Sequence, residues 1–454
     1  MSYTIITNQS QIISIIEREF EINGGIFRLK PTWVARPGIV QPGRRIKLGS
    51  EYLAQNLAVN ERWLASVTYS DNGIYNDMCP EDHGYSYIIV PEGLIKLKDA
   101  IDNCRELMLG SKGRKWDVLP KFFDNWNRIP FHMHPCQEHV SEGLLGKPES
   151  YHFPVELNIN RNASPATPVG VDPTYSDKQI MDYLSAYFKG DNRLTDIGNT
   201  VNILPGTGYF MPPCTLHAPG SLVTYELQAA SDVSCIPESR VNDMPMPPDM
   251  VDRDLPVKID KDGFDKVCEY MLDMIKCKNA GNMENFREEY FRPPITVRKE
   301  DEGEQKLVIY RCGKASEASN PDIYSSKRTE VKAKSEWNLT ETSAFGAIVL
   351  RGHGTLSANG KSPLEIESAS LFESRDDSFA DEFFVSAEAA KNLTVKANSH
   401  EPLAFYQHFA GGSNPEASTI KVPEYDFFQR RPTMESQAPN NKKAYVKYGN
   451  GSSG

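Results

Sequence analysis

The sequence lacks any run of apolar residues long enough to cross a bilayer, which would take roughly 18 in succession. Its first residues, from Met1 to Gln9, contain neither a basic start nor an apolar stretch, so the pattern of a secretory signal is missing. The eight cysteines include no C-x-x-C pair. In a long chain without a signal, such cysteines are expected to be reduced thiols, and the predicted location is the cytoplasm.

Positive charge is also scarce. The chain has 50 Lys and Arg against 61 Asp and Glu, which gives a formal net charge of -11. Phosphate polyanions are repelled by such a surface on average, so neither nucleic acid nor a membrane is an expected partner. A local group of Lys and Arg could still bind a small anionic substrate.

The remaining composition is that of a globular protein with a large core. Of the 454 residues, 39% are hydrophobic and 24% are charged. This length exceeds one ordinary core, so two domains or one elaborated pair are expected. Short alternating runs broken by Pro and Gly recur in two blocks, which predicts a mainly β protein with two β-barrels or sandwiches and a few short helices.

The strongest chemical signal is the pair His132 and His134 within Phe-His-Met-His-Pro. Residues i and i+2 of a strand face the same side, so two imidazoles can bind one metal ion. The alternative is two polar residues on a solvated strand face. A second segment runs from Gly206 through Pro212 and Cys214 to His217. It resembles the second cupin motif, with Cys214 where Gly usually stands, and in the cupin fold that His completes the site begun by H-x-H.

Two carboxylates compete for the fourth ligand position. Glu138 follows the histidine pair at a spacing that is common in cupins. Glu149, within Gly146-Lys-Pro-Glu149, opens the next predicted strand and could lie beside the pair.

The ordered motifs resemble the class I mannose-6-phosphate isomerases. The chain shares with that family His134-Pro, Gly146-Lys-Pro-Glu149, the Gly206–His217 segment and Glu226-x-Gln-x-x-Ser-Asp232, with a looser match at Asn60–Ser66. These motifs, across 61–232, cover over a third of the chain. The resemblance implies a bicupin, that is, two cupin-type β-barrels. It divides the chain into an N-terminal segment plus metal-binding catalytic cupin (1–245), a linker and helix (246–290), a second, metal-free cupin (291–430) and a flexible tail (431–454).

The same resemblance implies a ligand set and a reaction. It favours Glu149 over Glu138, so one divalent ion is expected to be held by the residues His132, His134, Glu149 and His217. Family members usually have Gln at the position of His132, and this nitrogen-rich set suits zinc first, with iron, nickel, cobalt or manganese as alternatives. The implied activity is aldose–ketose isomerisation of a sugar or sugar phosphate through an enediol, with Lys147 and Glu226 moving the protons. A homodimer is compatible with the resemblance.

One departure concerns the substrate. Family members carry an Arg ten residues after the counterpart of Glu226, and this chain has Ile236 there. Arg240 is the candidate replacement for substrate binding. Two other readings of the scaffold remain open: a cupin dioxygenase or lyase acting on a polyol or keto-sugar, and a non-catalytic sugar-binding bicupin.

Four further residues near the motifs are interpreted as structural. His139 and His152 are close in sequence to the ligands, but neither has their spacing. Cys136 and Cys214 are interpreted as buried thiols, with soft metal ligation as the alternative.

Overall fold

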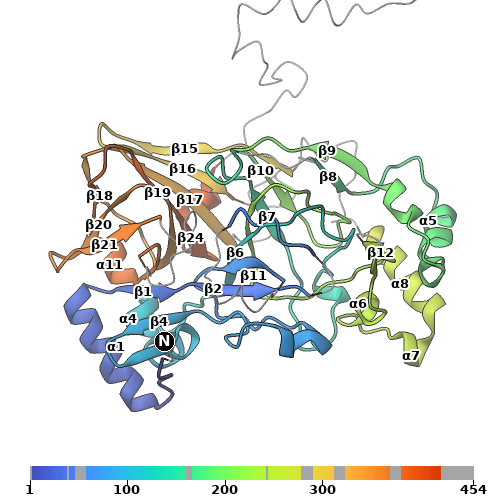
Figure 1. Ribbon diagram of the computed structural model, residues 1–454, viewed down its shortest axis with the longest axis horizontal. Helices are drawn as coiled ribbons and strands as arrows, with labels where there is room; N and C mark the ends of the chain where they lie inside the picture. The colour runs from blue at the N-terminus through green and yellow to red at the C-terminus, as the bar shows by residue number, and fades with distance from the viewer. Residues whose placement is uncertain are drawn as a thin grey trace, which may run out of the picture. The chain divides into compact units, whose positions relative to one another are not determined.

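The computed structural model describes residues 3–37, 40–46, 58–159, 166–241, 244–277, 290–310, 323–368 and 380–420. Residues up to Ile420 form one compact unit. The fold is mainly β with a few short helices, which confirms the predicted class (Figure 1). The predicted tail, 431–454, lies outside the described residues. No helix in the described ranges has the length and apolarity needed to span a bilayer.

The first helix shows how local sequence sets the boundaries. Helix α1 begins after Asn8, whose side chain accepts a hydrogen bond from the Gln11 N–H at 3.1 Å, and it ends at Gly24 with a φ of 65°. The helical segments of the described residues are α1 (Gln9–Asn23), α3 (Leu97–Asn103), α4 (Arg105–Leu109), α5 (Asp177–Leu184), α6 (Asp249–Asp252), α7 (Ile259–Asp262), α8 (Phe264–Ile275), α11 (Ala387–Ala390), α12 (Pro415–Thr419) and the 3-10 turns η1 (Gly73–Met78), η2 (Gln137–His139), η3 (Tyr187–Lys189) and η4 (Arg193–Ile197).

The strands of the described residues form two large sheets and three small ones. The nine-stranded sheet has the order β15 (Ile295–Lys299), β16 (Gly303–Ile309), β17 (Tyr324–Val331), β24 (Leu403–Ala410), β19 (Phe345–Arg351), β22 (Glu382–Val385), β1 (Ile26–Lys30), β4 (Tyr87–Val90) and β5 (Gly93–Lys96). The seven-stranded sheet has the order β14 (Phe291–Arg292), β10 (Gly208–Met211), β7 (Glu149–His152), β11 (Thr224–Ala229), β6 (Val118–Phe123), β3 (Val59–Trp63) and β2 (Thr32–Ala35).

The small sheets complete the β structure. They are β18 (Glu336–Leu339), β23 (Leu393–Ala397), β20 (His353–Ala358) and β21 (Leu364–Glu367); β12 (Arg240–Val241) with β13 (Met244–Pro245); and β8 (Ala166–Val169) with β9 (Asn199–Asn202). Within the described residues no sheet closes into a barrel by strand pairing. The two-barrel architecture therefore stays a prediction.

The first hundred residues, expected to complete the first β-block, are instead divided between the two large sheets. Strands β2 and β3 join the seven-stranded sheet, but β1 pairs with β22, Ile26 opposite Val385, and so extends the other sheet. Conversely, β14 from the second half pairs with β10 of the first. The two halves thus exchange strands, and apolar faces from both contribute to one core cluster that includes Phe122, Tyr225 and Tyr406.

The segment that follows β13, which the sequence predicts to be a linker, contains buried apolar residues. Met250, Val251 and Leu255 are buried, because α6 and the turn after it cover the same apolar cluster as α8. Helices α5, α7 and α8 lie together beyond the sheet (Figure 1). This packing places the end of α8 near the loops that carry the candidate site.

Candidate metal centre and cavity

Both predicted histidine motifs meet in space. His132 forms an antiparallel bridge with His217, with backbone N···O distances of 3.0 and 2.8 Å in the two directions. His134 lies two residues further along, so its side chain faces the same way as that of His132. The three rings gather closely, with centroids 4.2 Å (His132–His217), 4.8 Å (His132–His134) and 5.3 Å (His134–His217) apart.

Backbone carbonyls fix the orientation of each imidazole. The Nδ1 of His132 lies 2.7 Å from the Pro130 carbonyl oxygen, that of His134 2.8 Å from Val233, and that of His217 2.8 Å from Thr215. A carbonyl can only accept, so each Nδ1 carries the proton and each Nε2 presents a lone pair. Burial lowers the pKa of His134 to about 4, and it moves the pKa of His132 well below the usual value, so both rings are neutral at physiological pH.

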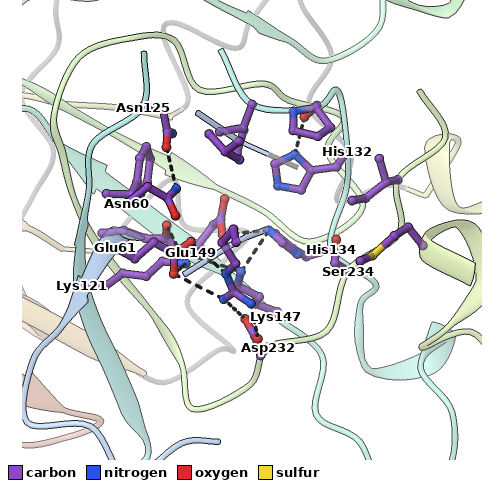
Figure 2. A pocket seen from close by; sticks show the side chains of 18 of the residues that line it. Asn60, Glu61, Lys121, Asn125, His132, His134, Lys147, Glu149, Asp232 and Ser234 are labelled. Carbon is purple, nitrogen blue, oxygen red and sulfur yellow. Dashed lines mark hydrogen bonds and ion pairs between the residues drawn. The ribbon is translucent and has the colours of Figure 1, made fainter. Parts of the chain in front are cut away.

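Glu149 opens β7 between β10 and β11, and its carboxylate lies between two of these rings. Oε2 is 3.0 Å from His134 Nε2, and Oε1 is 2.7 Å from His217 Nε2. Burial alone would raise the pKa of Glu149, but the positive charge of Lys147 beside it contributes to holding the pKa well below its usual range. Figure 2 shows Glu149 beside His134 and Lys147 in the cavity.

These atoms fit a divalent cation. The Nε2 of His217 has no hydrogen-bond partner among the described residues, although a carboxylate oxygen lies 2.7 Å away. Two lone pairs at that separation repel each other unless a positive charge lies between them. The candidate ligand atoms of His132, His134 and His217 all lie within 4.8 Å of one another. Three imidazoles and one carboxylate are donors typical of zinc and of the later first-row metals.

Two buried lysines and a second carboxylate adjoin the candidate ligands. Lys147 Nζ lies 3.2 Å from His134 Nε2, 3.3 Å from Glu149 Oε2 and 3.8 Å from Glu226 Oε1. Lys121, on β6, reaches the other oxygen of Glu226 at 3.4 Å. Burial and the nearby Glu149 raise the pKa of Glu226 to about 8. Burial alone would lower the pKa of Lys121, but Glu226 and Glu61 raise it.

A network around Arg36 forms another wall of the cavity. Its guanidinium contacts both oxygens of Asp232, at 3.0 and 2.9 Å, and both oxygens of Glu61, at 3.1 and 3.3 Å. Burial alone would raise the pKa of Glu61, but Arg36 and Lys121 lower it to about 2. Arg36 is thereby neutralised by two carboxylates. It thereby joins β3, which carries Glu61, to the segment after β11, which carries Asp232.

The sequence-predicted residues fall into two groups. His132, His134, Lys147, Glu149 and Glu226 line the cavity, and His217 adjoins it through Glu149. In contrast, Glu138 is exposed on η2, and Arg240 is exposed on β12 and does not line the cavity. Arg240 is close in sequence to Ile236, which does line the cavity, but β12 pairs with β13 and leaves Arg240 exposed.

Sequence reasoning missed the other charged residues of the cavity. Lys121, Arg36 and Arg253 come from three separated segments and line it together. Only Glu61 and Asp232 could have been found, because they lie in the segments that resemble the isomerase family.

No protein-family profile and no curated protein sequence matches this chain. Solved structures do match in fold. The mannose 6-phosphate isomerase of Bacillus subtilis superposes with a TM-score of 0.54 at 16% identity, over 85% of this chain and 99% of that one. A zinc-bound mannose 6-phosphate isomerase gives 0.54 at 12% identity, over 85% and 99% of the two chains. A variant of phosphomannose isomerase from Salmonella typhimurium gives 0.52 at 10%, also over 85% and 99%. The likeness at such identities is one of fold.

Proposed function

We propose that this protein is a metal-dependent aldose–ketose isomerase that acts on a sugar or sugar phosphate through an enediol. The observation that carries the proposal is the convergence of three imidazoles and Glu149 with Lys147 and Glu226, all of which line one cavity except His217, which adjoins it. The fold shared with mannose 6-phosphate isomerases supports it. We further propose that the two large sheets belong to two cupin-type barrels and that the first one is catalytic.

The residues His132, His134, Glu149 and His217 would hold a divalent ion, zinc by preference. The bound ion supplies Lewis acidity toward the carbonyl and hydroxyl oxygens of the substrate. The Nδ1 bonds to backbone carbonyls keep the imidazoles aimed before any ion arrives, which lowers the cost of binding.

Lys147 and Glu226 are the groups placed to move protons. Glu226 is almost fully buried, and its Oε1 has no hydrogen-bond partner among the described residues, so in the ionised carboxylate this oxygen can accept a proton from a bound sugar. Lys147 Nζ, 3.8 Å from that oxygen, can donate to the substrate oxygen on the neighbouring carbon. Lys121 holds the other oxygen of Glu226 in position. Transfer between C1 and C2 needs such a donor and acceptor side by side.

The charges of the cavity bear on whether the substrate carries a phosphate. The lining includes the cations Arg36, Lys121, Lys147 and Arg253 and the carboxylates Glu61, Asp71, Glu149, Glu226 and Asp232. Arg253 differs from the other cations: its nearest carboxylate, Asp254, is 3.9 Å away, and its Nη1 has no hydrogen-bond partner among the described residues. We therefore assign any anionic end of the substrate to Arg253, in place of Arg240.

The test is exchange of the C2 proton in deuterated water, followed by proton NMR, with metal-loaded protein and a panel of hexoses, pentoses and their phosphates. We expect exchange and ketose formation with one sugar class, and loss of both in Lys147→Met and Glu226→Gln. Lys327→Met is the matched control, because Lys327 is equally buried but pairs with Glu341 outside the cavity. Absence of exchange from metal-replete protein would refute the proposal, and oxygen consumption with bound iron would identify a dioxygenase instead.

A further inference from the structure

A second group of metal-ligating side chains lies outside the cavity. It consists of Cys136, His139, Cys214 and Cys277, whose sulfur and ring-nitrogen atoms all lie within 4.8 Å of one another. None of the four lines the cavity of the first site. We propose that these residues hold a structural zinc ion with three thiolates and one imidazole. This inference is independent of the proposed isomerase activity.

The donor set and its compactness fit tetrahedral zinc. Zn–S bonds of about 2.3 Å place the sulfurs of such a site roughly 3.8 Å apart, with S···N slightly less. Here Cys136 Sγ is 2.7 Å and Cys214 Sγ is 3.9 Å from His139 Nδ1. Side-chain adjustments of about 1 Å would therefore complete the geometry. Cys136, His139 and Cys214 are buried and Cys277 is half-buried, so four protein donors close the site and leave no open position for substrate.

The other nitrogen of His139 supports the assignment. Its Nε2 lies 3.2 Å from a carboxylate oxygen of Asp273, and its ring packs edge-on against Tyr270, with centroids 5.5 Å apart. A proton on Nε2 bonded to Asp273 leaves the Nδ1 lone pair directed at the sulfurs. Metal-binding histidines usually have this arrangement, in which the outer N–H donates to a carboxylate.

Helix α8 supplies both supporting residues, and the chain just beyond it supplies the last ligand. Tyr270 and Asp273 lie on one face of α8, and Cys277 follows two residues after the helix ends. Cys136 immediately precedes the η2 turn, and His139 is its last residue. An ion at this point would join α8 to the loop that leads away from His134.

The backbone of Cys214 provides a separate indication. Its φ is +65°, in the left-handed region that costs a non-glycine residue about 1–2 kcal/mol. The cupin motif that this segment resembles usually has Gly there, which would adopt the conformation without strain. A thiol retained at a strained position needs a compensating role, and metal ligation supplies one.

Binding has a defined proton balance. Each thiol loses its proton as its sulfur bonds to zinc, so up to three protons are released to solvent per ion, and the His139 Nδ1 contributes a lone pair. The hydrogen bond with Cys214 and, to a smaller extent, burial raise the pKa of the Cys136 thiol. A bound cation would offset both effects.

Cobalt substitution distinguishes the two candidate sites. Thiolate-bound Co²⁺ gives an intense sulfur-to-metal charge-transfer band in the near ultraviolet, which a site of imidazoles and a carboxylate cannot produce. We expect this band, and two zinc ions per full-length chain by elemental analysis. Cys214→Gly and Cys277→Ser should lose the band and one zinc. His134→Ala should lose one zinc and keep the band, and Cys104→Ala, which removes a buried thiol elsewhere, should keep both.

The outcomes against the proposal are equally specific. Absence of the band from the Co²⁺-loaded wild-type protein would overturn it, whether or not the variants fold. So would a band that survives in folded Cys277→Ser, or a Cys136–Cys214 disulfide in protein purified without oxidant. The backbone strain at Cys214 adds a further test. If the thiols bind no metal, Cys214→Gly should contain as much zinc as the wild type and be at least as stable, and that result would contradict the proposal.

Discussion

Replacement of Arg62 by Met tests the joint between the two large sheets. Arg62 lies on β3 of the seven-stranded sheet and is completely buried. Its guanidinium contacts both oxygens of Asp381, at 2.6 and 2.9 Å, and one oxygen of Glu382, at 3.0 Å. Glu382 begins β22 of the nine-stranded sheet, so this ion-pair group connects the sheets.

The expected loss follows from what the substitution leaves behind. Met fills a similar volume, but Asp381 and Glu382 then lie buried without a counter-ion. Removal of one partner of a buried pair costs about 3–5 kcal/mol, which is a large part of a stability of about 5–15 kcal/mol. Even beside Arg62, burial raises the pKa of Glu382 to about 7. Because this pKa is higher in the folded protein than the usual 4.5, ionisation of Glu382 lowers the stability as the pH rises from about 4.5 to about 7. Without Arg62 the pKa of Glu382 should rise further, so the stability of Arg62→Met should continue to fall at higher pH.

Urea denaturation at pH 5 and pH 8 measures this effect. Arg62→Met should lose more stability at pH 8 than at pH 5, and the triple variant that combines Arg62→Met with Asp381→Asn and Glu382→Gln should regain much of it. Lys178→Met is the control, because its pair with Asp182 is exposed on both sides and its loss should leave the midpoint unchanged. A loss below about 1 kcal/mol for Arg62→Met at both pH values would refute the reasoning.

Three further predictions concern pH, metal and substrate. Burial raises the pKa of Asp82 to about 6, although Lys30 opposes the shift, so ionisation of Asp82 lowers the stability of the protein as the pH rises from about 4 to 6. The stability of Asp82→Asn relative to the wild type should therefore be higher at pH 8 than at pH 4, by up to about 3 kcal/mol, as measured by thermal melts. His134→Ala should lose the metal of the first site by elemental analysis, and full retention would contradict the ligand assignment. Arg253→Ala should raise KM for a phosphorylated sugar at least tenfold, with kcat and the KM for the free sugar little changed; equal effects on both sugars would remove the phosphate role.

Features fixed by short stretches of sequence were predictable. The start of α5 is one such feature, because the side chains of Ser176 and Gln179 bond reciprocally to the backbone there. The histidine pair and the Gly206–His217 segment each carry their spacing within a dozen residues. The division of the N-terminal strands was not predictable, because β1 and β2 are separated by a single residue and look equally strand-like. Which sheet each one joins depends on partners such as β22, more than 300 residues away.

The charged wall of the cavity shows the same limit. Arg36, Lys121 and Arg253 have no motif and no common spacing, so only the fold reveals that they share a cavity. Sequence proximity pointed to Arg240 instead, and the β12–β13 hairpin exposes it. Charge recognition depends on where a side chain ends, and closeness in sequence does not determine that position.

The candidate thiol site and the candidate histidine site are linked through the backbone. Cys136 lies two residues beyond His134, and Cys214 lies three before His217, so both candidate sites draw on the same two backbone segments. The Cys214 N–H also donates to the His134 carbonyl at 2.7 Å, which joins the segments directly. An ion on the sulfurs would hold these segments at the spacing that the imidazoles need. Cys277 belongs to neither segment; its backbone N–H donates to the Met274 carbonyl at the end of α8.

Replacement of Cys277 should nevertheless weaken metal binding at the histidines. Unchanged affinity of the histidine site in a chelator competition would show that the two sites are mechanically separate.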